Sequence, residues 1–272
     1  MPHKLSLAFL TMFDCGPLEI IDAAGAAGFD MVGLRLLPAA PTEAPYPLFN
    51  DPAVLRDTIS ALRSSNVTVA DVEIARLKPD TNVADFERFL DCSAQLGARH
   101  VLVAGDDRDA ARLTDRFAAL CRLCARFGLT ADLEFMPWTG VRNLSEGRKI
   151  VEDAGEPNGG VLIDALHFDR SQSTLEEIRD LPRSLVNYVQ LCDGPLDYGK
   201  SDEEQILVAR SARLMPGDGG IDCVGLAKSL PEDVTISVEV PNHEMAKIVE
   251  PAERARLAYA AARKVLAAAA RP

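Results

Sequence analysis

The sequence predicts a single (β/α)8 barrel that extends over residues 1–272, and two observations support this prediction. Eight short runs of strand-like composition alternate with amphipathic helical segments along the whole chain. Residues that commonly end helices precede the early strands at spacings of 38, 31, 31 and 31 residues: Gly28, Asn66, Gly97, Gly128 and Gly159. The expected strands are residues 5–10, 31–36, 68–74, 100–104, 130–135, 160–164, 185–191 and 235–240.

The expected helix starts agree with this alternation. Asn143, Ser173 and Ser201 each stand three residues before a Glu, which is the spacing of a capping box. A doubly wound sheet is the competing fold, and it would place a glycine-rich dinucleotide fingerprint after the first strand. Residues 10–17 contain a single glycine, Gly16, so the barrel is favoured.

Composition and charge narrow the class of ligand. The 272 residues are 47% hydrophobic and 26% charged, which is typical of a globular protein with an aliphatic core. The net charge of −12 opposes binding to nucleic acid or to an anionic membrane surface. We find no apolar run of the roughly 18 residues that a membrane span needs, and no leader pattern at the start. We therefore expect a cytoplasmic protein with a small-molecule substrate, and a homo-oligomer stays open.

The six cysteines have no disulfide-framework spacing, so we expect them to be reduced and buried. Cys121 and Cys124 have the spacing that begins some zinc sites. No second cysteine pair or histidine pair accompanies them, which favours a structural role.

Four of the expected strands end on a polar residue within an apolar run: Glu134, Asp164, Gln190 and Glu239. Catalytic residues of a (β/α)8 barrel lie at the carboxyl ends of its strands. Three unpaired carboxylates in a dry core would each cost several kcal/mol. We therefore expect the four side chains to converge on one divalent metal ion. The alternative is that each pairs with a nearby Arg or Lys, or points outward.

Five further residues are candidates for the same pocket. His167 follows Asp164 by three residues, where an imidazole with a pKa near 6.5 could exchange a proton with substrate. Arg213 opens a loop rich in Pro and Gly, where its guanidinium could bind ligand oxygens. Trp138, the only Trp, is a candidate pocket wall, with core packing as the alternative. Glu73 and Arg35, near the ends of their strands, complete the set of expected substrate-binding residues.

These residues resemble the sugar phosphate isomerase/epimerase superfamily, the xylose isomerase-like barrels. That group includes ketose 3-epimerases, inosose dehydratase, 3-dehydroshikimate dehydratases and type IV endonucleases. The similarity covers nearly the whole chain and is most specific at Glu134, Asp164-x-x-His167, Arg213-x-x-Pro-Gly-x-Gly and Glu239. The resemblance implies that Glu134, Asp164 and Glu239 bind metal, and that His167 and Arg213 contact substrate oxygens.

Gln190 departs from the commoner pattern, because the epimerases usually have His there. An all-oxygen ligand set favours Mn²⁺ or Mg²⁺ over Zn²⁺, with Co²⁺ as a further option. Gln at this position is similar to some bacterial 3-dehydroshikimate dehydratases.

The expected reaction starts with abstraction of a proton beside the carbonyl of a small polyhydroxylated compound, through a metal-stabilised enediolate. Glu134, His167 and Glu239 are the expected catalytic residues. An isomerase or epimerase is slightly favoured, and a dehydratase, which shares the first step, is the alternative. A barrel that binds a sugar acid without turnover is the second alternative. A type IV endonuclease is disfavoured, because the chain has four His and an acidic charge.

Overall fold

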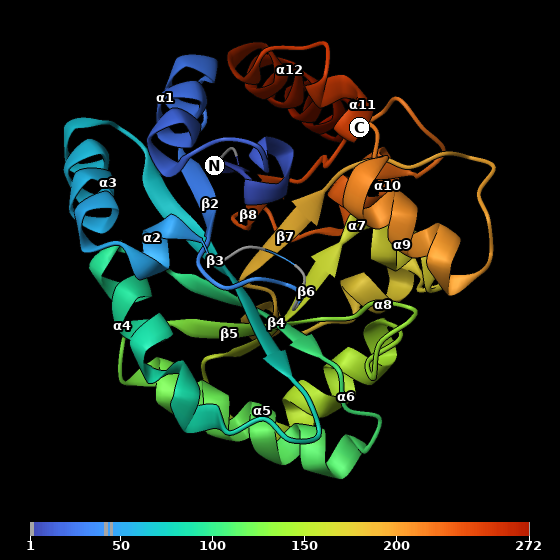
Figure 1. The fold of residues 1–272 in the computed structure, drawn as a ribbon. Coiled ribbons are helices and arrows are strands. Elements are labelled where there is room, and N and C mark those ends of the chain that lie inside the picture. The colour runs from blue at the N-terminus through green and yellow to red at the C-terminus, as the bar shows by residue number, and fades with distance from the viewer. Residues whose placement is uncertain (1–2, 41–42, 44–45, 272) are drawn as a thin grey trace.

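A closed parallel barrel forms the centre of the computed structural model, which describes residues 3–40, 43 and 46–271 (Figure 1). Each strand pairs with its neighbours in sequence, and β8 pairs with β1 to close the barrel. The predicted (β/α)8 fold is confirmed. The strands are β1 Leu5–Leu7, β2 Met31–Arg35, β3 Thr68–Leu77, β4 His100–Gly105, β5 Thr130–Glu134, β6 Gly159–Asp164, β7 Tyr188–Leu191 and β8 Thr235–Val238.

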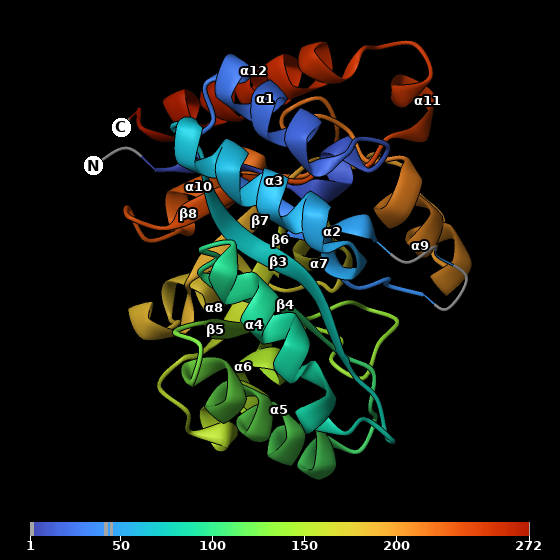
Figure 2. The ribbon, with the colours of Figure 1, turned by 60° about the vertical axis from the view of Figure 1, so that its left-hand side comes forward.

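The helices surround this barrel, and the last long helix lies beside the first (Figures 1 and 2). They are α1 Pro17–Ala27, α2 Pro47–Asn50, α3 Pro52–Ser64, α4 Glu87–Gln95, α5 Ala110–Ala125, α6 Leu144–Ala154, α7 Ala165–Arg170, α8 Leu175–Arg179, α9 Asp202–Ser211, α10 Cys223–Ser229, α11 His243–Ala246 and α12 Pro251–Ala269. Short 3-10 helices lie at Phe9–Met12, Val83–Phe86 and Arg183–Leu185. In the described part of the chain, no helix is long and apolar enough to span a membrane.

Three of the five expected helix-ending residues adopt the left-handed conformation: Gly28, Gly97 and Gly128. The expectation is wrong for Asn66 and Gly159. Helix α3 ends at an extended Ser65, and α6 ends at a left-handed Gly155, four residues before Gly159.

The expected helix starts at Asn143 and Ser201 are confirmed, because each side chain accepts a hydrogen bond from the backbone N–H three residues later. The cap expected at Ser173 is wrong by one residue. Thr174 caps α8 in a capping box with Glu177, while the Ser173 hydroxyl accepts from the N–H of Leu144.

Side chains point alternately to the two sides of each strand, so the apolar ones form two separate layers. On β6, Val161 and Ile163 belong to the core between the strands and the helices, whereas Leu162 belongs to a small cluster inside the barrel. Asp164, two residues after Leu162, therefore points into the barrel. The same alternation turns Gln190 inward, two residues after the interior Tyr188.

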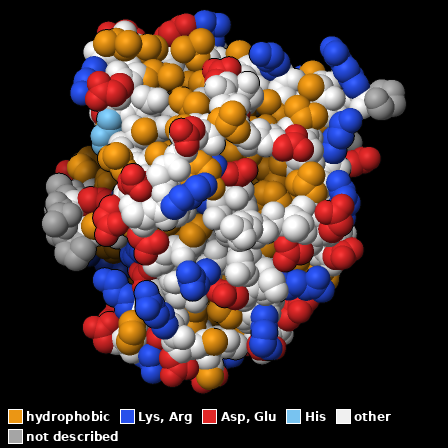
Figure 3. All heavy atoms as spheres, turned by 90° about the vertical axis from the view of Figure 1, so that its right-hand side faces the viewer, with side chains coloured by type: hydrophobic (Ala, Val, Ile, Leu, Met, Phe, Trp, Pro, Cys, Tyr) orange, Lys and Arg blue, Asp and Glu red, His pale blue; other side chains and the backbone are white. Residues whose placement is uncertain are grey.

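All six cysteines are free thiols, and five of them are buried. Burial raises the pKa of Cys124 to about 12 and that of Cys121 as well. The expectation of reduced, buried thiols is met, except that Cys15 is only half-buried. On the surface, acidic and basic side chains are intermingled on the face in Figure 3.

Candidate active site

A cavity of about 340 Å³ opens at the carboxyl ends of the strands. Seven of the predicted site residues line it: Arg35, Glu73, Glu134, Trp138, His167, Arg213 and Glu239. Asp164 and Gln190 are fully buried directly behind these residues. A larger hollow of about 940 Å³ lies over α5 and α6 and includes Trp138, but none of the predicted metal ligands.

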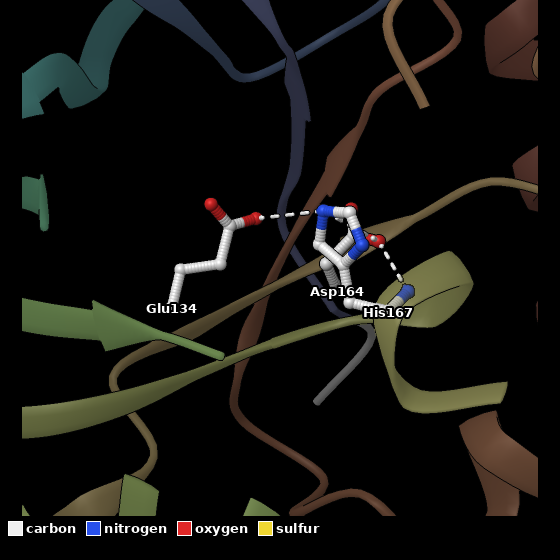
Figure 4. A group of neighbouring side chains, drawn as sticks. All are labelled: Glu134, Asp164 and His167. Atoms are coloured by element: carbon white, nitrogen blue, oxygen red, sulfur yellow. Dashed lines mark hydrogen bonds and ion pairs between the residues drawn. The ribbon is translucent and has the colours of Figure 1, made fainter. Parts of the chain in front are cut away.

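Glu134, Asp164 and His167 form the centre of the site (Figure 4). Glu134 is the last residue of β5, Asp164 is the last residue of β6, and His167 lies in the first turn of α7. Asp164 caps α7, because its Oδ1 accepts a hydrogen bond from the N–H of His167 at 3.0 Å. The Nε2 atom of His167 lies 3.6 Å from Oε1 of Glu134 and 3.9 Å from Oδ1 of Asp164. The cap explains why a helix begins directly after β6 and carries His167 in its first turn.

Gln190 and Glu239 extend this group across the next two strands. Gln190 is the register partner of Asp164 on the neighbouring strand. Its Nε2 donates to Oε1 of Glu239 at 2.7 Å, which leaves its carbonyl oxygen Oε1 buried and without a hydrogen-bond partner among the described residues. The free atom of Gln190 is therefore the oxygen that a metal ion could bind.

Arg213 bridges two of the predicted metal ligands. Its Nη1 donates to Oδ2 of Asp164 at 2.6 Å, and its Nη2 lies 3.0 Å from Oε2 of Glu239. All three side chains are buried. Asp164 and Glu239 are therefore paired with an arginine, as the alternative expected, although the two share one guanidinium. Three carboxylates against one guanidinium still leave a negative excess that a divalent cation would balance.

The carboxyl groups of the site differ in acidity. Burial raises the pKa of Glu134 well above its usual range, and the charges of Asp164 and Glu239 add to this effect. Burial also raises the pKa of Glu239 to about 8, against the attraction of Arg213. Burial alone would raise the pKa of Asp164, but Arg213 and His167 together lower it below its usual value. Asp164 is therefore the carboxylate that stays charged most readily.

The imidazole of His167 is buried, which the sequence did not indicate. Burial lowers the pKa of His167 to about 4, although the charge of Asp164 opposes the shift. The expectation of an unperturbed pKa near 6.5 is wrong, and the ring is neutral near pH 7. Its Nδ1 has no hydrogen-bond partner among the described residues.

The remaining candidates form the wall of the cavity. Arg35 donates from Nε to Oε2 of Glu73 at 3.0 Å, and both side chains are buried. Trp138 packs edge-on against the ring of His167, with ring centroids 5.1 Å apart. Contact of these three side chains with a substrate stays a prediction.

Asp193 is a residue of the site region that the strand-end argument missed. It is fully buried, and its carboxylate accepts four backbone hydrogen bonds at 2.8–3.0 Å, from Gly194, Gly217, Gly219 and Ile221. Its own N–H and C=O pair with Leu214. The available signal was an acidic residue directly before Gly194-Pro195, opposite a loop with three glycines. Asp193 thereby fixes the loop that begins at Arg213.

The residues present are compatible with a divalent metal ion. Glu134, Asp164 and His167 can each offer one ligand atom, and these atoms lie within 4.8 Å of one another. Gln190 can add its unpartnered carbonyl oxygen. His167 was expected to contact substrate and not metal, but its imidazole is also within reach of an ion held by the two carboxylates.

Comparison with curated proteins finds a relative that is similar to part of this chain. A curated relative, the 3-dehydroshikimate dehydratase of Pseudomonas aeruginosa, is 28% identical over 150 residues. These cover 53% of this chain but only 23% of the relative, so the chain matches less than a quarter of that protein's length.

Two solved structures share the fold over almost the whole of both chains. The IolI protein with a zinc atom superposes with a TM-score of 0.81 at 19% identity, covering 97% of this chain and 98% of that one. D-psicose 3-epimerase in the presence of D-fructose gives a TM-score of 0.70 at 16% identity, covering 97% and 99%. Residues 21–267 also match the family model described as xylose isomerase-like TIM barrel. The chain therefore belongs to the xylose isomerase-like TIM barrel family.

Proposed function

We propose that this protein is a divalent-metal-dependent enzyme that removes a proton beside the carbonyl group of a small polyhydroxylated compound. The observation that carries the proposal is the convergence of Glu134, Asp164 and His167 at the carboxyl ends of β5 and β6, where Glu134 and His167 line one small cavity and Asp164 is buried beside them. Polar side chains that converge at the carboxyl ends of barrel strands lie where the active sites of such barrels are found.

Glu134, Asp164, Gln190 and Glu239 would hold the metal ion, and their oxygen atoms favour Mn²⁺ or Mg²⁺. When bound, the ion supplies positive charge that stabilises the anion formed as the proton leaves. Arg213 orients two of these ligands, because it holds one oxygen each of Asp164 and Glu239 and leaves the other oxygen of each carboxylate to other partners.

Glu134 and Glu239 are suited to move the proton. Both side chains line the cavity in which a bound molecule would lie, so each carboxylate is within reach of a proton on it. They project from different strands, so two faces of a bound molecule are within their reach. The neutral imidazole of His167 can donate a hydrogen bond at the same end of the cavity.

We favour dehydration as the overall reaction, with a hydroxyl group leaving from the carbon next to the deprotonated position. Support comes from the partial similarity to 3-dehydroshikimate dehydratase and from Gln190, where the epimerases usually have His. Epimerisation or isomerisation is the second candidate, supported by the position of Glu134 and Glu239 on different strands. It shares the first step and differs in where the proton returns.

A single screen tests the proposal and separates these outcomes. The protein with Mn²⁺ is incubated in deuterated water with 3-dehydroshikimate, inososes and ketoses, and the products are followed by mass spectrometry. Dehydration gives a product lighter by one water, whereas epimerisation or isomerisation incorporates deuterium without loss of water. If no compound exchanges or reacts, and Mn²⁺ is shown to be bound, the chain is a non-catalytic binding barrel and the proposal is wrong.

A further inference from the structure

We propose that Arg210 binds a carboxylate of the substrate at the mouth of the cavity, so that the enzyme acts on a sugar acid or related carboxylated compound. This inference rests on the proposed function and adds the chemical class of the substrate. The starting observation is that Arg210 is the one cavity arginine for which the described residues provide no carboxylate partner.

Arg210 lies in the last turn of α9 and lines the cavity together with Ala209 and Arg213. The side chain of Arg210 is exposed, whereas that of Arg213 is buried. Residues three and four positions away along the chain are Ile206, Leu207, Arg213 and Leu214, so its own helix offers no acidic neighbour at contact spacing.

The other three arginines that line the cavity are neutralised by acidic side chains. Arg35 pairs with Glu73, and Arg76 binds Asp106 through two hydrogen bonds of 2.7 and 2.9 Å. Arg213 is held by Asp164 and Glu239. In the part of the chain that the structure describes, the side chain of Arg210 forms no hydrogen bond and no ion pair.

The cavity is therefore polarised along its depth. Its buried part carries Glu134 and Glu239, which belong to the proposed metal site, and its exposed part carries the guanidinium of Arg210 and the carboxylate of Glu43, which already pairs with Arg35. A carboxylated molecule lowers its electrostatic energy by placing its carboxylate at the mouth, where a guanidinium can bind both oxygens. Its carbonyl and hydroxyl groups then face the catalytic residues. This orientation leaves the reacting carbon next to Glu134 and Glu239.

The test compares a carboxylate with its neutral counterpart at the same site. Binding of 3-dehydroshikimate and of its methyl ester to the Mn²⁺-loaded protein is measured by calorimetry, for the wild type and for Arg210→Gln. We expect the wild type to bind the acid about tenfold more tightly than the ester. Arg210→Gln should bind both with similar affinity, at an unchanged Kd for the ester. Arg63→Gln, an exposed position on α3 away from the cavity, is the matched control and should keep the wild-type difference.

Two results would overturn the inference. The first is that the wild type binds the acid no more tightly than the ester. The second is that Arg210→Gln keeps the wild-type difference in affinity between the acid and the ester. Failure of the proposed reaction gives a different result: binding depends on Arg210 as expected, but no ligand exchanges deuterium or loses water.

Discussion

Gln190 is poised to offer an oxygen atom because its amide nitrogen is already used by Glu239. Replacing it with His substitutes a nitrogen ligand, which suits softer ions than an amide oxygen does. Gln190→His should therefore keep metal binding and shift the preference toward Zn²⁺ or Co²⁺. Competitive metal titrations of both proteins measure the order of affinities, with the exposed Gln95→His as control. An unchanged order would mean that Gln190 is not a direct ligand.

His167 lies close enough to two carboxylates that its role needs a direct test. If it acts on the substrate, His167→Asn should leave metal affinity within a few-fold of the wild type. Turnover should fall by about 10²–10⁴, the usual contribution of a positioned proton-transfer group. Metal titration and steady-state kinetics measure the two effects, and His3→Asn, outside the cavity, is the control. Loss of the metal in the His167 variant would make the imidazole a ligand.

The identities of the site residues could be predicted from the sequence, but their mutual contacts could not. Glu134, Asp164 and Gln190 stand out because each interrupts an apolar strand near its end. The bridge made by Arg213 joins residues 49 positions apart in the chain and depends on the path of a loop. The lowered pKa of His167 likewise depends on burial by distant elements, which no local pattern records.

At the scale of elements, the loop that follows Arg213 depends on one buried carboxylate. Asp193→Asn keeps the side-chain size, but it replaces one acceptor oxygen by an NH₂ group that faces backbone N–H donors. We expect a loss of ~3 kcal/mol in the free energy of unfolding, because at least two backbone donors lose their acceptor. Hydrogen exchange should become faster across residues 214–221.

Chemical denaturation and exchange mass spectrometry measure these two effects. Asp109→Asn is the control, because Asp109 caps α5 from an exposed position and Asn caps helices equally well. Equal stability and equal exchange in Asp193→Asn and the wild type would show that the carboxylate does not hold the loop.

The positions of the strands could be predicted from the sequence composition, but several of the strand ends could not. The first strand ends at Leu7, because the chain turns into a 3-10 helix at Phe9–Met12. Phe9 and Met12 are buried in the same core as the strand, so the apolar run continues past its end. The seventh strand begins at Tyr188 and not at residue 185, since a 3-10 helix occupies Arg183–Leu185. β3, by contrast, continues to Leu77, beyond its predicted end at residue 74.

At the scale of the whole molecule, the repeat of strand and helix was sufficient to predict the closed barrel. Most of the apolar core lies between the strands and the helices, away from the site, so we expect variants of the polar site residues to keep the fold. Glu239→Ala should abolish activity and metal binding, while circular dichroism spectra and the melting temperature of the metal-free proteins stay close to the wild type. Glu232→Ala, at an exposed position, is the control. Unfolding of the Glu239 variant would instead assign that residue a structural role.

The central claim is that one metal ion lies among side chains at the carboxyl ends of four consecutive strands, β5 to β8. The most direct measurement is the anomalous scattering of a crystal soaked in Mn²⁺. We predict a single strong peak within coordination distance of Glu134, Asp164, Gln190 and Glu239, at about 2.0–2.3 Å from their oxygen atoms. A crystal of the intact protein with no peak among these residues, or with its peak at another place in the molecule, would contradict the account.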